Sequence, residues 1–208
     1  MSFRVAVLIS GEGTNLQALL DSVHGRGEIE IVAVASSRPD ARGLERARAA
    51  GVETGVFAGA EHGDRAARDD ALARWLEERR VELVVLAGFM EILSPAFIRR
   101  FAGRIINVHP ALLPGFPGID AIRQAPDYGV KLMGVTVHFV DEGVDTGPIV
   151  AQEAFELPYD ADIAAIEQRV HEVEHRLLPA TVRLIAEGRV RIDEQNPRLV
   201  NVDRNASG

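Results

Sequence analysis

The chain has 208 residues, of which 47% are hydrophobic and 26% are charged, and this is the composition of a globular protein that can bury a full core. Its formal net charge of −8 argues against a nucleic-acid backbone as a general partner. The absence of cysteine excludes disulfides and thiolate metal sites and favours a reducing compartment, the cytoplasm. We expect no secretory leader and no membrane span, because the chain runs from Met1 directly into a strand and its apolar runs are short.

The first half of the chain alternates apolar runs with helical patterns. The apolar runs predict strands at residues 5–9, 31–35, 52–57, 83–86 and 105–109. The patterns between them predict helices at residues 16–23, 43–50, 64–80 and 94–101. Because strands separated by helices are joined by right-handed crossovers, we predict an α/β, Rossmann-like fold with a mostly parallel sheet and helices on both faces.

The second half predicts a different arrangement. Strands at 134–140 and 149–155 are joined by a short, turn-rich link, which indicates an antiparallel hairpin at one end of the sheet. A long helix at 162–187, a short strand at 190–192 and a loose polar tail at 196–208 follow. We therefore expect a single domain of two halves, 1–109 and 110–195, joined at a proline-rich loop and followed by the tail.

A glycine turn, Ser10-Gly11-Glu12-Gly13-Thr14-Asn15, lies between the first strand and the first helix. Free N–H groups and the helix dipole at such a turn favour an anion. The turn lacks the last glycine of a dinucleotide fingerprint and the Gly-Lys-Ser/Thr of a P-loop. We therefore favour a site for a single phosphate and leave open a turn that is merely tight.

The strand at 105–109 carries two polar residues at its end. Side chains alternate across a strand, so Asn107 and His109 face the same way, and Pro110 stops the strand. Ligands of parallel sheets bind beyond the carboxyl ends of the strands, although a buried His at such a place is as often structural. Of three nearby acids in the loop after the next strand, we expect Asp145 to point inward. A carboxylate beside an imidazole favours its protonated form, and an imidazolium with an amide suits the oxyanion of acyl transfer.

Two further patterns have competing interpretations. His171-Glu172-Val173-Glu174-His175 matches H-x-x-E-H, with two histidines on one helix face as in a zinc site, but no third ligand is evident and we expect no metal. Ala87 to Leu93 is either core or the wall of a pocket for a flat organic group, and the pattern alone favours core.

Several motifs together resemble the folate-dependent formyltransferases. Their signature is similar to Gly134-x-Thr136-Val137-His138-Phe139-Val140-Asp141-Glu142-x-x-Asp145-x-Gly147, and their catalytic segment is similar to Asn107-x-His109-Pro110-x-x-Leu113-Pro114. The glycine turn and Leu86-Ala87-Gly88-Phe89-Met90 extend the resemblance to roughly residues 4 to 190. The resemblance implies a formyltransferase fold and formyl transfer from 10-formyltetrahydrofolate, as co-substrate and without a metal, to the amine of glycinamide ribonucleotide in purine biosynthesis.

The resemblance also implies residue roles. The implied catalytic residues are Asn107, His109 and Asp145, with Asp145 favouring the cationic form of His109. The implied ribonucleotide contacts are Gly13, Thr14, Asn15, His171, Glu172, Val173 and Glu174. The implied folate contacts are Arg65, Met90, Glu91, Ile92, Leu93, Asn107, Val140, Asp141, Glu142, Gly143, Val144 and Asp145. Glu91 departs from the pattern, because a close relative has a basic residue there.

Alternative functions stay open on the sequence. Within the family they are transfer to another amine, such as methionyl-tRNA or an amino sugar, and hydrolysis of the formyl-folate. We expect neither, because 208 residues leave no room for the extra domains that those enzymes usually carry. Outside the family they are a non-catalytic nucleotide-binding module and a zinc hydrolase. The partners we expect are small molecules, neither nucleic acid nor membrane, with a homodimer left open.

Overall fold

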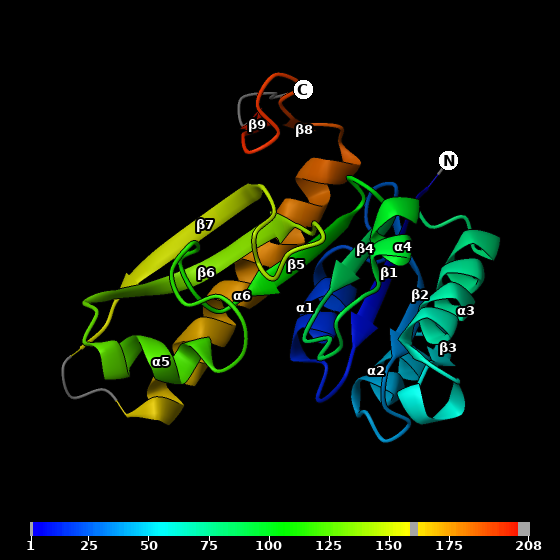
Figure 1. Ribbon diagram of the computed structural model, residues 1–208, viewed down its shortest axis with the longest axis horizontal. Helices are drawn as coiled ribbons and strands as arrows, with labels where there is room; N and C mark the ends of the chain where they lie inside the picture. The colour runs from blue at the N-terminus through cyan, green and yellow to red at the C-terminus, as the bar shows by residue number, and fades with distance from the viewer. Residues whose placement is uncertain (1, 159–161, 204–208) are drawn as a thin grey trace. The chain divides into compact units, whose positions relative to one another are not determined.

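The computed structural model describes residues 2–158 and 162–203, and its backbone forms two compact units (Figure 1). The first unit runs to Asn107 and the second begins at Val108. This division falls two residues before the join that the sequence predicts, and the roles assigned to the two halves stay predictions. Each unit is described by itself below.

Parallel strands form the centre of the first unit. They are β1 (Phe3–Ile9), β2 (Ile29–Ser36), β3 (Glu53–Val56), β4 (Leu83–Leu86) and β5 (Ile105–His109), whose last two residues belong to the second unit. β1 pairs with β2 on one side and β4 on the other, β3 extends the sheet beyond β2, and β5 pairs with β4 through Ile105 to Asn107. Val5 to Ile9 of β1 are fully buried, which explains the unbroken apolar run there.

Helices cover both faces of this parallel sheet. They are α1 (Thr14–Ser22), α2 (Gly43–Ala49), α3 (Arg65–Glu78) and α4 (Pro95–Arg100), with a short 3₁₀ helix η1 (Gly59–Glu61) before α3. Right-handed crossovers with this strand order require α1 and α2 on one face and α3 and α4 on the other, and each pair is in contact (Figure 1). Side chains cap two of these helices: Asp64 Oδ1 accepts from Ala67 N (2.8 Å) and Ser94 Oγ accepts from Phe97 N (3.3 Å).

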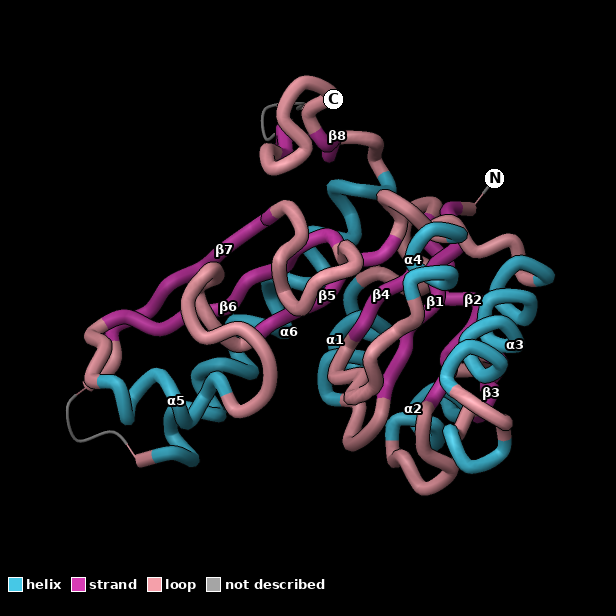
Figure 2. The backbone as a smooth tube through the Cα atoms, in the orientation of Figure 1, coloured by secondary structure: helices cyan, strands magenta, loops and turns pink. Residues whose placement is uncertain are grey.

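The second unit contains an antiparallel hairpin covered by a long helix (Figure 2). Its elements are α5 (Ala121–Tyr128), β6 (Leu132–Phe139), β7 (Ile149–Glu156), α6 (Ile163–Ala186), β8 (Val190–Ile192) and β9 (Val200–Val202). α6 packs on β6 and β7 through buried residues such as Ile166, Val170 and Val173. No helix within the described residues, the 24 residues of α6 included, is long and apolar enough to cross a bilayer.

The predicted fold class is confirmed. The seven strands follow the order β3-β2-β1-β4-β5-β6-β7, the strand pairs from β3 to β5 are parallel, and β6–β7 is antiparallel. Predicted strand bounds agree with the structure to within two residues, and β4 and β5 agree at both ends.

Three elements of the structure are absent from the sequence prediction. The 3₁₀ helix η1 and the helix α5 lie in segments for which the sequence predicts no element, and α5 contains Pro126, which is unfavourable inside a helix. The sequence predicts a loose tail from Asn196 onward, but β9 lies within it and pairs with β8. A three-residue strand is too short to show a period in the sequence. The end of the predicted tail, 204–208, lies outside the described residues.

Gly134 in β6 lies close both to the neighbouring strand of the hairpin and to the loop after β5. A Cβ at Gly134 would lie 2.2 Å from the carbonyl oxygen of Glu153 on β7 and 2.6 Å from Leu112 Cδ2. The first of these contacts is with backbone, so it is relieved only if the hairpin itself shifts. Glycine is therefore needed at this position for close approach and not for a turn.

We predict that Gly134→Ala lowers the free energy of unfolding by about 1–3 kcal/mol, because the added methyl group overpacks the hairpin. In open space the same change within a strand would raise stability by roughly 0.5–1 kcal/mol, so the sign alone is diagnostic. Urea denaturation gives the measurement. Gly63→Ala is the matched control, because a Cβ there meets nothing within 4 Å. An unchanged or raised stability for Gly134→Ala would contradict the prediction.

Candidate active site

His109 ends β5 and is almost fully buried, with 4% of its surface exposed. Its Nδ1 lies 3.3 Å from Oδ2 of Asp145, and its Nε2 lies 2.8 Å from the carbonyl oxygen of Phe116. Two of the residues implied as catalytic, far apart in the chain, are therefore in contact within the second unit.

The other oxygen of the same carboxylate faces a second imidazole. His138 Nε2 lies 3.5 Å from Asp145 Oδ1, and His138 Nδ1 lies 2.8 Å from the carbonyl oxygen of Phe139. The sequence analysis places His138 in a strand and gives it no role. Period-two alternation could have found it, because Thr136 and His138 are polar residues on the same face of an apolar strand and both are buried.

The two imidazoles share one electrostatic property. In His109 and in His138 each ring nitrogen faces an oxygen that can only accept a hydrogen bond, a main-chain carbonyl on one side and the Asp145 carboxylate on the other. A neutral imidazole carries a single N–H, so it leaves one of these oxygens facing a lone pair. Only a ring that carries a hydrogen on both nitrogens could donate to both oxygens at once.

The Asp145 carboxylate is also bound by the main chain. Its Oδ2 accepts from Gly118 N at 2.8 Å, and the residue itself has a left-handed φ of +52°. Burial of the carboxyl raises its pKa, but the hydrogen bond from His138, the Gly118 N–H and the charges of His109 and His138 lower it more, so its pKa lies below the ordinary value. Asp145 is therefore a carboxylate in the folded protein, and it points inward as predicted, with 12% of its side chain exposed.

A hydroxyl holds the loop after His109 to the hairpin. Thr136 Oγ1 donates to Ala111 O (2.7 Å) and accepts from Leu113 N (3.1 Å), and Gln152 Nε2 donates to both Leu113 O and Thr136 Oγ1 (2.9 Å each). These four contacts fix the start of the proline-rich loop. Since the same loop supplies the Phe116 carbonyl and the Gly118 N–H, Thr136 also orders the acceptor and the donor that hold His109 and Asp145.

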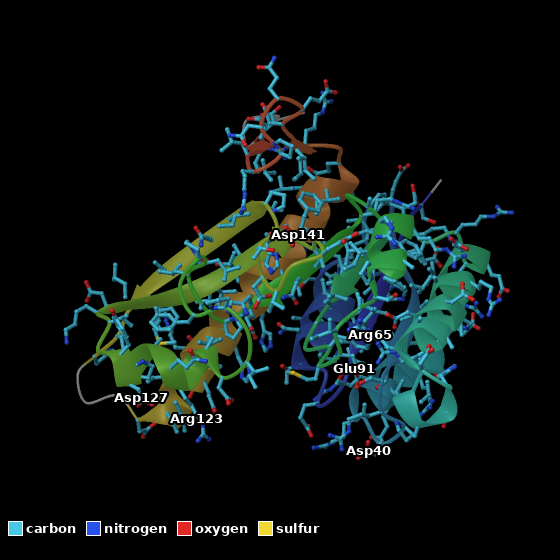
Figure 3. All side chains as sticks on the ribbon, viewed as in Figure 1. Asp40, Arg65, Glu91, Arg123, Asp127 and Asp141 are labelled. Carbon is cyan, nitrogen blue, oxygen red and sulfur yellow. The ribbon has the colours of Figure 1, made fainter. Side chains whose placement is uncertain are left out.

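The loop from Val140 to Asp145, implied as a folate contact, is shaped by its own side chains. Asp141 Oδ1, labelled in Figure 3, accepts from Gly143 N (3.1 Å) and from Thr146 Oγ1 (2.6 Å). A Cβ at Gly147 would lie 1.8 Å from Phe139 O, so only glycine fits where the loop returns to β6. Val144 is exposed, while Asp145 next to it is turned in.

Asn107 belongs to the first unit and pairs with Leu86 of β4 in the parallel register. It is half-buried, two residues before His109 on the same strand, so strand alternation places both on one face. The role of Asn107 stays a prediction.

The glycine turn lies between β1 and α1, as predicted. Gly13 caps α1 with φ +72°, and a Cβ on it would lie 2.6 Å from Gly43 Cα. At the first residue of the turn, Ser10 Oγ bonds to Ser37 Oγ (2.7 Å) and accepts from Met90 N (2.8 Å). One hydroxyl therefore links the segments that follow β1, β2 and β4. α1 begins at Thr14 with no acid in its first turn, which suits an anion.

The residues of the segment after β4, Ala87 to Leu93, differ in their exposure to solvent. Ala87 and Leu93 are buried, but Met90 and Ile92 are 75% and 64% exposed, so core, the favoured interpretation, is wrong for the middle of the segment. Glu91, the residue that departs from the family pattern, forms an ion pair with the buried guanidinium of Arg68 on α3 (Nη1–Oε2 2.7 Å). Arg65, implied as a folate contact, starts the same helix (Figure 3).

On α6 the implied substrate contacts lie on two faces. His171 and Glu172 are exposed, whereas Val173 and Glu174 are buried. The rings of His171 and His175 stack with centroids 5.9 Å apart, and burial of His175 and the charge of His171 lower the pKa of His175. This face lines a shallow groove of about 410 Å³, formed by Ala164, Glu167, Gln168, His171, Glu172 and His175.

The H-x-x-E-H pattern does not gather further ligands. Within residues 2–158 and 162–203, no group of three or more His, Cys, Asp or Glu side chains could hold a metal ion. Glu172 is engaged with Arg169 at 2.8 Å. In the structure, His171 and His175 are therefore a stacked pair of rings on α6.

A comparison with known families gives the class of protein to which this fold belongs. A formyl transferase family model matches residues 3–182, so the chain belongs to the formyl transferase family.

Individual relatives and solved structures are more specific than the family model. The chain is 41% identical over 193 residues, or 92% of its length and 91% of the relative's, to phosphoribosylglycinamide formyltransferase of Haemophilus influenzae. It is 45% identical to part of the trifunctional purine biosynthetic protein adenosine-3 of Gallus gallus, and it spans only 14–19% of the length of the trifunctional relatives. Among solved structures, glycinamide ribonucleotide transformylase 1 of Symbiobacterium toebii superposes with a TM-score of 0.92 at 46% identity, covering 97% of this chain and 94% of that one.

We predict that Asp145→Asn lowers the free energy of unfolding at neutral pH and that the difference from wild type shrinks as the pH falls. The folded-state pKa of Asp145 is depressed, so its charge stabilises the fold above the unfolded value of about 3.9, and that stability is lost as the pH falls through the folded value. Urea denaturation at a series of pH values from about 7 to 3 measures the difference. A difference that grows toward acid would contradict the assigned direction.

Proposed function

We propose that this protein transfers the formyl group of 10-formyltetrahydrofolate to the amine of N1-(5-phospho-D-ribosyl)glycinamide, a step of de novo purine (IMP) biosynthesis. The observation that carries the proposal is the 41% identity to a protein named phosphoribosylglycinamide formyltransferase across nine tenths of both chains. The contact between His109 and Asp145 supports it independently, because it joins an imidazole to a carboxylate, two groups that can take part in the proton transfer proposed below.

The proposed chemistry is direct transfer. The uncharged amine of the ribonucleotide attacks the formyl carbon, and a C–N bond forms as the carbonyl oxygen becomes an oxyanion. Asn107 and the imidazolium of His109 stabilise that oxyanion. The proton released by the attacking nitrogen passes by way of Asp145, through water, to the folate nitrogen whose bond to carbon breaks. Formylated ribonucleotide and tetrahydrofolate result.

Nε2 is the nitrogen of His109 that would meet the oxyanion, because Nδ1 faces Asp145. In this structure Nε2 contacts the carbonyl of Phe116. The proposed transfer therefore requires one acceptor to replace another, the formyl oxygen taking the place of the main-chain oxygen. The exchange adds no unpaired donor to a buried site, provided the Phe116 carbonyl then meets water.

The remaining implied contacts are part of the proposal. Gly13, Thr14 and Asn15 would bind the phosphate at the start of α1, supported by the left-handed turn and by a first turn without acids. The segment from His171 to Glu174 would contact the rest of the ribonucleotide. Folate contacts would come from Arg65, from Met90 to Leu93, and from the loop between Val140 and Asp145, where exposed apolar side chains suit a flat ring.

The cell compartment and the partners complete the proposal. A cytoplasmic location is supported by relatives named as purine biosynthetic proteins. The proposed partners are the two small-molecule substrates, without nucleic acid or membrane, and a homodimer is a further prediction that gel filtration would test.

We predict that His109→Ala and Asp145→Ala each reduce kcat by about 10²–10³-fold, since one loses the oxyanion donor and the other its electrostatic partner and proton route. Steady-state turnover of the purified variants gives the measurement, with circular dichroism to confirm folding. His62→Ala is the control, a histidine whose ring stacks on Phe57. If either variant kept more than about a tenth of normal kcat, the assigned roles would be wrong.

We predict that deformylation of a 10-formyl folate analogue, followed by absorbance, depends on added glycinamide ribonucleotide. Deformylation without an amine would indicate a hydrolase, and activity only with methionyl-tRNA or an amino sugar would indicate another member of the family. Binding of both ligands without turnover would indicate a nucleotide-binding module. Activity that is lost with chelators and restored by zinc would favour a zinc hydrolase.

A further inference from the structure

A charged network lies beneath the segment that follows β4. Arg68 on α3 is 2% exposed, and its guanidinium donates to the Asp69 carboxylate through Nε (2.9 Å) and Nη2 (2.7 Å). The same guanidinium donates to Glu91 Oε2 (2.7 Å) and to the carbonyl oxygen of Ile92 (3.3 Å). One buried cation therefore binds the side chain of one residue of the segment and the main chain of the next.

Asp69 extends the network to the end of the segment. It is 1% exposed, and its Oδ2 accepts from Ser94 N at 2.5 Å, immediately before the first residue of α4. At the other end, Met90 N donates to Ser10 Oγ. These contacts together hold residues 90, 91, 92 and 94, and Met90 and Ile92 are left with their apolar side chains in solvent.

Apolar side chains that a restrained backbone keeps exposed to water are unfavourable in the free protein, but they can favour the binding of a ligand. A mobile loop could turn Met90 and Ile92 inward, but here the fixed main chain keeps them out. A main chain that is already held in place loses less conformational entropy when a flat ligand covers its side chains, so the restraint favours binding. Such pre-organisation is worth more than an extra contact on a loop that must first be ordered.

We propose that Arg68 is a positioning residue for the folate co-substrate: through Glu91 and the Ile92 carbonyl it fixes the Met90–Leu93 segment in its ligand-accepting form. The proposal rests on the proposed function, because the folate role of this segment comes from it. Arg68 itself, with 2% of its side chain exposed, acts through the segment and not by touching the ligand.

Charge gives a second reason for the same pairing. Folates carry carboxylates, and an unpaired Glu91 at the surface of a folate-contacting segment would repel them. The guanidinium of Arg68, which Asp69 shares, holds the 42%-exposed carboxylate of Glu91 at 2.7 Å and offsets part of its negative charge. The acid at position 91 is thus directed to a buried cation of this chain rather than to the ligand.

The test compares Arg68→Met, Arg68→Lys and Glu91→Gln with a matched control. Arg100→Met removes another arginine that ties α4 to α3, through Asp70 (2.7 Å) and Glu77 (2.5 Å), without a contact to the segment. Each variant is assayed for kcat and for the KM values of the two substrates, the formyl-folate and glycinamide ribonucleotide. Calorimetric titration with tetrahydrofolate measures binding without turnover, and thermal melting reports folding.

We expect the folate KM and the tetrahydrofolate Kd to rise by about 3–10-fold in Glu91→Gln and by about 10-fold or more in Arg68→Met, with the ribonucleotide KM changed by less than about 2-fold. Arg68→Lys should be intermediate, because an ammonium keeps the charge but lacks the fork that reaches both partners. Arg100→Met should leave all three constants near those of wild type.

Glu91→Gln keeps the test decisive if Arg68→Met fails to fold, because the exposed side of the pair is altered without burying a new charge. An unchanged folate KM and Kd in folded Glu91→Gln and Arg68→Lys would overturn the positioning role. So would an equal rise in both KM values, or the same rise in Arg100→Met. Wild-type protein that binds tetrahydrofolate but transfers no formyl group would instead overturn the proposed function, and the Kd series would still test the positioning role.

Discussion

The second unit depends on one carboxylate that two imidazoles share. One carboxylate oxygen of Asp145 contacts His109, and the other contacts His138. The remaining nitrogen of each ring contacts a main-chain carbonyl oxygen. An isolated buried carboxylate would be costly, and so would buried ring nitrogens without a hydrogen-bond partner. Together they offset one another, and the Gly118 N–H adds a fixed dipole of the right sign. A strained backbone at Asp145, with φ +52°, is tolerated because these contacts hold it from three directions.

The first unit also contains a buried charge that is held by partners, and there the charge is a cation. Arg68 lies below the surface with Asp69 at its side, and the pair binds the segment that leaves β4. Both units therefore use paired charges near the ends of strands, where the regular hydrogen bonds of the sheet stop and loops need other partners. In the second unit the charges belong to the proposed chemistry. In the first they hold the main chain still.

Local patterns predict the elements of this fold that are long or buried on both sides. The strand of Val5 to Ile9 and the cap at Ser94 are evident because burial and capping leave side-chain signals. The contact partner of Asp145 could also be expected from the motif. The Phe116 carbonyl and the Gly118 N–H could not, because main-chain groups are the same at every residue. α5 is hidden by Pro126, and the Arg68–Glu91 pair is hidden because 23 positions separate its members and neither residue type is usually buried.

Ser10 provides one hydroxyl for two neighbours, the Ser37 hydroxyl and the Met90 N–H. The turn proposed to bind a phosphate and the segment proposed to bind the pterin ring of the folate are thus both hydrogen-bonded through a single oxygen atom. Binding of either ligand would make the segment that binds the other ligand more rigid. Such a thermodynamic linkage acts equally in both directions. Loss of that oxygen would weaken both affinities at once.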